Sequence, residues 1–273
     1  MFPARAKQTM SSFTTPLRLA FESYRFLLTN LHHLWKLATI RLVATLTSAS
    51  LIEWISLEIE DQWLDMKFSG KFFLFTFAKI LVYVITFSSV AITWHKATLN
   101  QEGLKQALTP KLNVTSRRYA LHSLLLSGSI LMTIAIALFG TNTLAAALAP
   151  LVSQEEKVAS RLITMPTLLF ILVASCKWLP TLPSLATDKI PDRPWKLEWK
   201  NIPISSAISL FIICLVTLTP LALISKQLLQ FANNSNIWSQ IPLVLLSELV
   251  MGCALLCFLA GLSLYHYKTR NSH

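Results

Sequence analysis

Six long apolar stretches dominate the sequence and leave few folds open to it. They run from residues 37 to 57, 72 to 94, 119 to 140, 161 to 179, 203 to 225 and 241 to 265. Each is close to the roughly 20 residues that a helix needs to cross the hydrocarbon core of a membrane. The first is the least apolar, because Arg41 and Glu53 interrupt it. The stretches predict an all-α fold, a polytopic membrane helix bundle with six transmembrane helices.

Composition and charge point the same way. Of the 273 residues, 53% are hydrophobic and only 14% are charged, which is too little polar surface to coat a soluble domain of this size. The net charge is +11, but the basic residues lie in short segments between the apolar stretches. There they act as topology signals and do not form a basic face for nucleic acid. We therefore expect membrane lipids as partners and no nucleic acid.

The distribution of Lys and Arg predicts the orientation. If the N-terminus is cytoplasmic, the inner segments hold 17 of these residues and the outer segments hold 5. The inner set is Arg5, Lys7, Arg18, Arg25, Lys36, Lys96, Lys105, Lys111, Arg117, Arg118, Lys177, Lys189, Arg193, Lys196, Lys200, Lys268 and Arg270. The outer set is Lys67, Lys71, Lys157, Arg161 and Lys226. Cytoplasmic segments carry such an excess, so we expect both termini on the cytoplasmic side of a bacterial inner membrane. Without the 37 to 57 span the basic N-terminus would lie outside.

Residues 1 to 36 are predicted to form a cytoplasmic segment with an amphipathic helix that starts near Pro16. Its apolar stripe is Leu17, Ala20, Phe21, Tyr24, Leu27, Leu28, Leu31 and Leu34. Basic residues on the opposite face are typical of a helix in the inner membrane interface. Packing against the cytoplasmic ends of the bundle is the alternative. Residues 37 to 267 form the membrane domain, and residues 268 to 273 form a cytoplasmic tail.

Arg41 lies about one turn from the inner end of its predicted span and can reach the headgroups, but three charged residues farther from the inner surface require an explanation. Counting 1.5 Å per residue from the outer helix ends places Lys79 and Glu248 at a similar depth, about 10 Å below the outer surface. Glu53 lies near the outer end of the first span and can join them. One hypothesis is a polar intramembrane site for an ion, a proton or a polar substrate. The other is a structural ion pair that fixes helix packing.

A second group of residues lies at the predicted inner surface. Trp94, His95 and Lys96 end the second span, and Arg117 and Arg118 begin the third. Cationic groups beside aromatic rings at the same leaflet are candidates for contacts with lipid headgroups. The alternative is that they are ordinary positive-inside anchors.

Signatures of catalysis and of metal binding are absent from the sequence. It contains no GxSxG, HExxH, Walker A or Rossmann glycine motif. Cys253 and Cys257 share a helical face, but no other type of metal ligand clusters near them. We therefore expect both to act as small, buried hydrophobic residues. We expect no enzyme activity, no metal and no cofactor.

The run from residue 94 to 99, followed by Arg117, Arg118 and Tyr119 at the start of a span, resembles an element of uncharacterised bacterial six-helix inner-membrane proteins. The stretches 17 to 30, 179 to 185 and 195 to 201 are similar to other elements of that family. The family is distantly similar to the membrane domain of glycerophosphodiester phosphodiesterases. This sequence departs from it with Lys96 in place of the usual arginine and no glycine-asparagine pair after Trp199. The resemblance implies the six-span topology, and the family has no established activity that could be transferred to this chain.

Two functions are compatible with these features. The first is a non-enzymatic accessory or lipid-interacting membrane protein, based on the basic and aromatic residues of the inner surface. The alternative is a small-solute or ion transporter that uses Lys79, Glu248 and Glu53.

Overall fold

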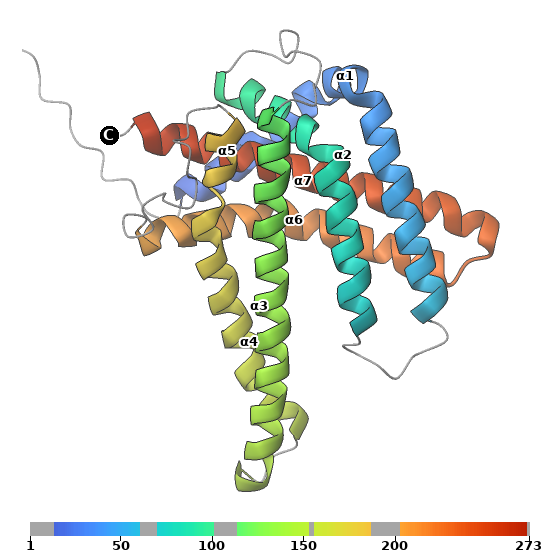
Figure 1. Cartoon of the computed structure of the whole chain (residues 1–273), viewed down its shortest axis with the longest axis vertical. Coiled ribbons are helices and arrows are strands. Elements are labelled where there is room, and N and C mark those ends of the chain that lie inside the picture. The colour runs from blue at the N-terminus through green and yellow to red at the C-terminus, as the bar shows by residue number, and fades with distance from the viewer. Residues whose placement is uncertain (1–13, 61–69, 101–113, 153–155, 187–202, 272–273) are drawn as a thin grey trace, which may run out of the picture.

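The computed structural model describes residues 14–60, 70–100, 114–152, 156–186 and 203–271 (Figure 1). Within these ranges every regular element is a helix, which confirms the all-α prediction for the part of the chain described. The helices are α1 (Thr14–Glu60), α2 (Gly70–Asn100), α3 (Val114–Val152), α4 (Glu156–Ser175), η2 (Cys176–Trp178), α5 (Thr181–Ala186), α6 (Ile204–Asn233) and α7 (Ile237–Asn271). The predicted stretch 195 to 201 lies outside the described residues.

Five segments are long and apolar enough to cross a membrane. They are Phe73–Leu99, Val114–Gly140, Thr164–Ala186, Ile204–Asn233 and Trp238–Thr269, which correspond to the second to sixth predicted spans. The first predicted span, 37 to 57, is helical within α1 but is not among them. Arg41, Glu53 and several Ser and Thr residues lower its hydropathy. The described residues therefore show five candidate spans where the sequence predicted six.

The N-terminal amphipathic segment is not a separate helix. Helix α1 runs without a break from Thr14 to Glu60, so the predicted boundary at residues 36 and 37 falls inside it. The boundary at residues 267 and 268 likewise falls inside α7. Along α1 the predicted stripe is divided: Phe21 and Leu28 are exposed, whereas Ala20 and Leu27 are buried, as are Leu19 and Ser23 outside the stripe. The face of α1 that packs on α6 and α7 therefore overlaps the predicted stripe only in part.

Tyr24 fixes this part of α1 on α6. Its hydroxyl donates to the backbone carbonyls of Val216 and Thr217, each at 3.0 Å. Burial raises the pKa of Tyr24, so the hydroxyl stays protonated and able to donate over the ordinary pH range.

The helices form two crossed groups (Figure 1). Helices α6 and α7 run side by side across the view, whereas α2, α3, α4 and the C-terminal part of α1 run downward. Helix α7 is the central element, because it contacts α1, α2, α5 and α6. Half of its apolar window is buried inside the protein, compared with 11% for α3. The many apolar side chains exposed on α3 and α4, such as Ile136, Phe139 and Phe170, suit a lipid environment.

Gly261 lies at a close approach of α7 to α6 and α1. A Cβ atom at this position would lie 2.8 Å from Ile213 Cγ2 of α6 and 3.5 Å from Ser23 Oγ of α1. Gly252, on the same helix, has nothing within 4 Å of the equivalent point. Small residues at such crossings let helix backbones approach closely in membrane proteins.

We therefore expect Gly261→Ala to destabilise the protein by about 1–3 kcal/mol through overpacking. The matched control, Gly252→Ala, should be neutral or slightly stabilising, because alanine has the higher helix propensity. Thermal unfolding of the purified variants in one detergent measures both effects. Equal melting temperatures for the two variants would contradict the assigned packing.

Candidate functional site

Three charged side chains from three helices meet in one cluster. Lys79 of α2 donates from Nζ to Glu53 Oε2 of α1 and to Glu248 Oε1 of α7, both at 2.6 Å. The sequence placed Lys79 and Glu248 at the same depth and named Glu53 as a third member. The structure brings all three into direct contact. We call these three residues, together with Tyr83, which bonds to Glu248, the ionic cluster.

Tyr83 is the member that the sequence analysis missed. It lies one helical turn after Lys79, and its hydroxyl donates to Glu248 Oε2 at 2.9 Å. The spacing of four residues places both side chains on the same face of α2, and this was the signal available in the sequence. Both carboxylate oxygens of Glu248 are therefore occupied by donors from α2.

The ionic cluster is largely removed from solvent and lipid. The Glu248 side chain is 1% exposed, that of Glu53 is 18% exposed and that of Lys79 is 25% exposed. Two carboxylates share one ammonium group, so the cluster carries one net negative charge in its ionised form. A buried charge without a counter-ion is costly in a low-dielectric interior. The cluster is consequently poised to accept one more positive charge.

A cavity of about 620 Å³ lies beside the ionic cluster. Helices α1, α2, α3, α5, α6 and α7 and the short segment before α5 contribute to its wall. The lining residues are Glu53, Phe75, Thr76, Lys79, Ile80, Tyr83, Val84, Phe87, Ser88, Ala91, Tyr119, Ser123, Leu126, Ser127, Ile130, Leu179, Leu182, Leu218, Glu248, Met251, Leu255, Phe258 and Leu259. The charges are confined to the cluster, and the rest of the wall is apolar apart from a few hydroxyl groups. This volume and this lining are typical of a site for a small molecule.

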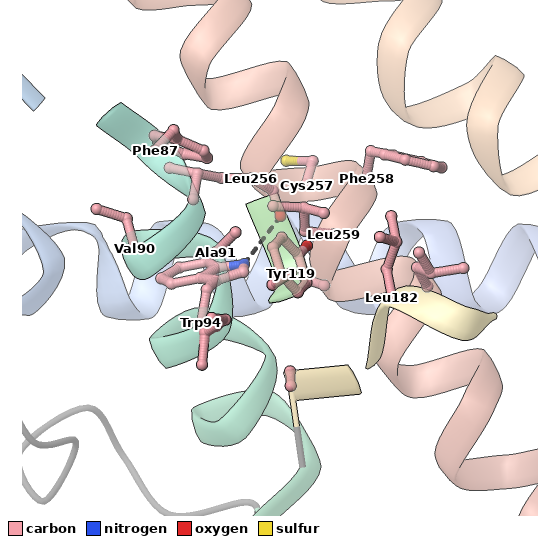
Figure 2. Close-up of a cluster of buried hydrophobic side chains, with 14 of the residues drawn as sticks. Phe87, Val90, Ala91, Trp94, Tyr119, Leu182, Leu256, Cys257, Phe258 and Leu259 are labelled. Atoms are coloured by element: carbon pink, nitrogen blue, oxygen red, sulfur yellow. Dashed lines mark hydrogen bonds between the residues drawn. The ribbon is translucent and has the colours of Figure 1, made fainter. Parts of the chain in front are cut away.

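Trp94 is buried in the hydrophobic core between α2 and α7. Figure 2 shows its ring among Val90, Ala91 and Leu256, with the indole Nε1 donating to the Leu256 carbonyl at 2.9 Å. Its exposed fraction is 0%. Trp94 therefore does not reach a lipid headgroup, and its predicted headgroup contact is wrong in this structure. The helix continues to Asn100, so Trp94 lies within α2 and not at its end.

His95 is also fully buried and bonded on both sides. Its Nδ1 lies 2.6 Å from Ser263 Oγ of α7, and its Nε2 lies 2.9 Å from the Tyr119 hydroxyl of α3. The predicted headgroup contact of His95 is wrong for the same reason. Because Tyr119 lines the cavity, His95 supports the wall opposite the ionic cluster.

The remaining predicted headgroup residues lie nearer the surface. Arg117 and Arg118 are exposed in the first turns of α3, and Lys96 is half-buried. Of the five residues predicted to contact lipid headgroups, only Arg117 and Arg118 are exposed.

The four cysteines are free thiols, and Cys253 and Cys257 lie on α7 close to the core. Within the described ranges, no three His, Cys, Asp or Glu side chains gather as a metal site would require.

The part of the chain that the structure describes is an all-helical protein with five helices of membrane-spanning length and apolarity. It has the character of a multi-pass membrane protein. No family model, curated protein or solved structure matches the chain.

Proposed function

We propose that this chain is an integral membrane protein that binds a small amphipathic solute in the cavity beside the ionic cluster, as a small-solute transporter does. The observation that carries this proposal is the coincidence of the cavity with Glu53, Lys79 and Glu248. A purely structural ion pair would be expected to lie between packed helices. Here the charged groups line an open volume of about 620 Å³.

The proposal reverses the order of the two functions expected from the sequence. The lipid-interacting function relied on five inner-surface residues, and two of them, Trp94 and His95, are buried. Arg117 and Arg118 support lipid contact as an accompanying property of the membrane domain. We assign no reaction to the cavity; its charged groups bond to one another and to Tyr83.

The first test fills the cavity. Ser127 lines it, whereas Ser129 lies two residues along α3 and is exposed outside it. We expect Ser127→Phe to abolish solute binding by occupying the volume, and Ser129→Phe to leave it unchanged. Three probes with a chain of twelve carbon atoms cover the possible headgroups: dodecyltrimethylammonium, dodecanol and laurate, whose last carbon is that of the carboxylate. Binding is measured on protein in neutral-lipid nanodiscs.

Saturable binding of at least one probe, lost in Ser127→Phe and kept in Ser129→Phe, supports the proposed function. Equal probe binding by Ser127→Phe and Ser129→Phe would mean that the probe lies in the surrounding lipid, and it would contradict the proposal. Absence of binding of all three probes to the unaltered protein would do the same.

We further propose that residues 37 to 57 form a sixth span, with both termini in the cytoplasm of a bacterium. The excess of Lys and Arg in the inner segments supports this orientation. Helices α3, α6 and α7 have 39, 30 and 35 residues, well beyond the length needed to span. This extra length lets crossed helices share one membrane by tilting.

An even number of spans places both termini on the same side. We therefore expect epitope tags at residue 1 and residue 273 to be protected from protease that is added to intact spheroplasts. Both tags should be cleaved once the spheroplasts are lysed. Digestion of one tag alone in intact cells would indicate an odd number of spans and would exclude the sixth.

A further inference from the structure

We infer that the ligand of the cavity is an organic cation with an apolar tail, such as an alkyl amine or a quaternary ammonium amphiphile. The inference rests on the proposed binding function and adds the charge and shape of the solute. It follows from the balance of charges in the ionic cluster and from the distribution of apolar residues along the cavity.

The charge of the cavity favours a cation. Among its lining residues the charged groups are the carboxylates of Glu53 and Glu248 and the ammonium group of Lys79, which together carry one net negative charge when both carboxylates are ionised. Among the described residues, no arginine and no second lysine lines the volume. Charges attract strongly where water is excluded, so a positively charged headgroup gains a favourable interaction here. Tyr83 adds an aromatic ring beside the carboxylates, a common neighbour of bound ammonium groups.

An anionic ligand is disfavoured by the same geometry. Among the described lining residues its one cationic partner would be Lys79, which already contacts two carboxylates at 2.6 Å. An anion would have to displace one of them and leave it buried without a partner, at considerable cost. A fatty-acid carboxylate therefore does not suit this site.

The shape of the cavity favours a long apolar tail. On α2 its wall extends from Phe75 to Ala91, which corresponds to about 24 Å along the helix axis. The ionic cluster lies near one end, at Lys79 and Glu248. The other end is lined by Ala91, Tyr119, Leu182 and Leu259, which belong to the buried hydrophobic cluster drawn in Figure 2. A headgroup at the cluster thus leaves room for an alkyl chain that runs along Phe87 and Leu255 toward that end.

The decisive comparison uses the three twelve-carbon probes, which differ chiefly in headgroup. In neutral-lipid nanodiscs we expect dodecyltrimethylammonium to bind at least about tenfold more tightly than dodecanol or laurate, after subtraction of the Ser127→Phe background. A tenfold difference in affinity is the size expected from one charge-assisted contact of modest strength. Equal affinity for dodecanol, or preference for laurate, would overturn the inference while the proposed function stands. Binding of no probe would instead remove the proposed function itself.

Two variants test whether net charge causes the preference. Glu248→Gln removes one carboxylate and makes the cluster neutral, so the preference for the cation should fall to less than about threefold. The double variant Lys79→Met with Glu248→Gln leaves Glu53 as one net negative charge, so the preference should return. Dodecanol binding reports that the cavity is intact in each variant. A preference that is unchanged in Glu248→Gln, or that does not return in the double variant while dodecanol still binds, would contradict the charge mechanism.

Discussion

Replacement of Lys79 by methionine is expected to be among the most damaging single changes in this protein, with a loss of about 3–5 kcal/mol of stability. The substitution keeps an apolar stem of similar length and removes only the ammonium group. Glu53 and Glu248 would then face each other without a counter-ion, and the Glu248 side chain is 1% exposed. Removal of one partner from a buried ion pair is costly because it leaves the other charge uncompensated.

The matched control is Lys226→Met, at an exposed position of α6. It should change stability by less than about 0.5 kcal/mol. Unfolding of both variants in a titration with sodium dodecyl sulfate, followed by circular dichroism, measures the difference. Similar losses in the two variants would show that the ion pairs at Lys79 contribute little.

Within the ionic cluster, a second substitution should restore part of the stability that Lys79→Met removes. In the Lys79→Met background, Glu248→Gln removes the deeply buried carboxylate that has lost its partner. The double variant should therefore be more stable than Lys79→Met alone, which is the non-additivity expected of groups in direct contact. Because of this gain in stability, the double variant can be used in the probe-binding experiment described above.

Depth along a helix could be read from the sequence, and this is why the charged residues of the cluster were found. Lys79 and Glu248 lie at similar distances from the outer ends of their predicted spans, and a constant rise per residue turns that spacing into depth. Which way each side chain points around its helix is a separate matter, and it depends on neighbours that are distant in the sequence. Tyr83 was missed for that reason, although it follows Lys79 by one turn.

The face of α1 that packs on the other helices could not be derived from its apolar stripe. The stripe containing Phe21 and Leu28 was expected to face the membrane interface or, as the alternative, the cytoplasmic ends of the bundle. Lipid is itself apolar, and helices in it pack through small and hydrogen-bonding residues. The buried residues of α1 accordingly include Ala20, Ser23 and Asn30, while Phe21 and Leu28 are exposed. Hydropathy identified the five apolar helices, but the crossing of α6 and α7 over the others depends on such contacts and could not be derived from periodicity.

Trp94→Ala is the second change for which a large loss is expected, again about 3–5 kcal/mol. The indole ring is 0% exposed and packs edge-on against Phe26 of α1, with ring centroids 5.0 Å apart. Its Nε1 also donates to the Leu256 carbonyl of α7. Truncation would open a cavity where α1, α2 and α7 meet, and the surrounding helices could close it only in part.

The control is Trp238→Ala, because Trp238 lies on α7 and is 83% exposed. An exposed tryptophan near a helix end anchors at the membrane interface, and its removal should have a much smaller effect on unfolding in detergent, where no bilayer is present. Both variants are compared with the unaltered protein by thermal unfolding in detergent and again in nanodiscs. Burial predicts that Trp94→Ala is destabilised equally in the two media. A loss seen for Trp94→Ala in nanodiscs but not in detergent would mean that its ring contacts lipid headgroups, and it would restore the role predicted from the sequence.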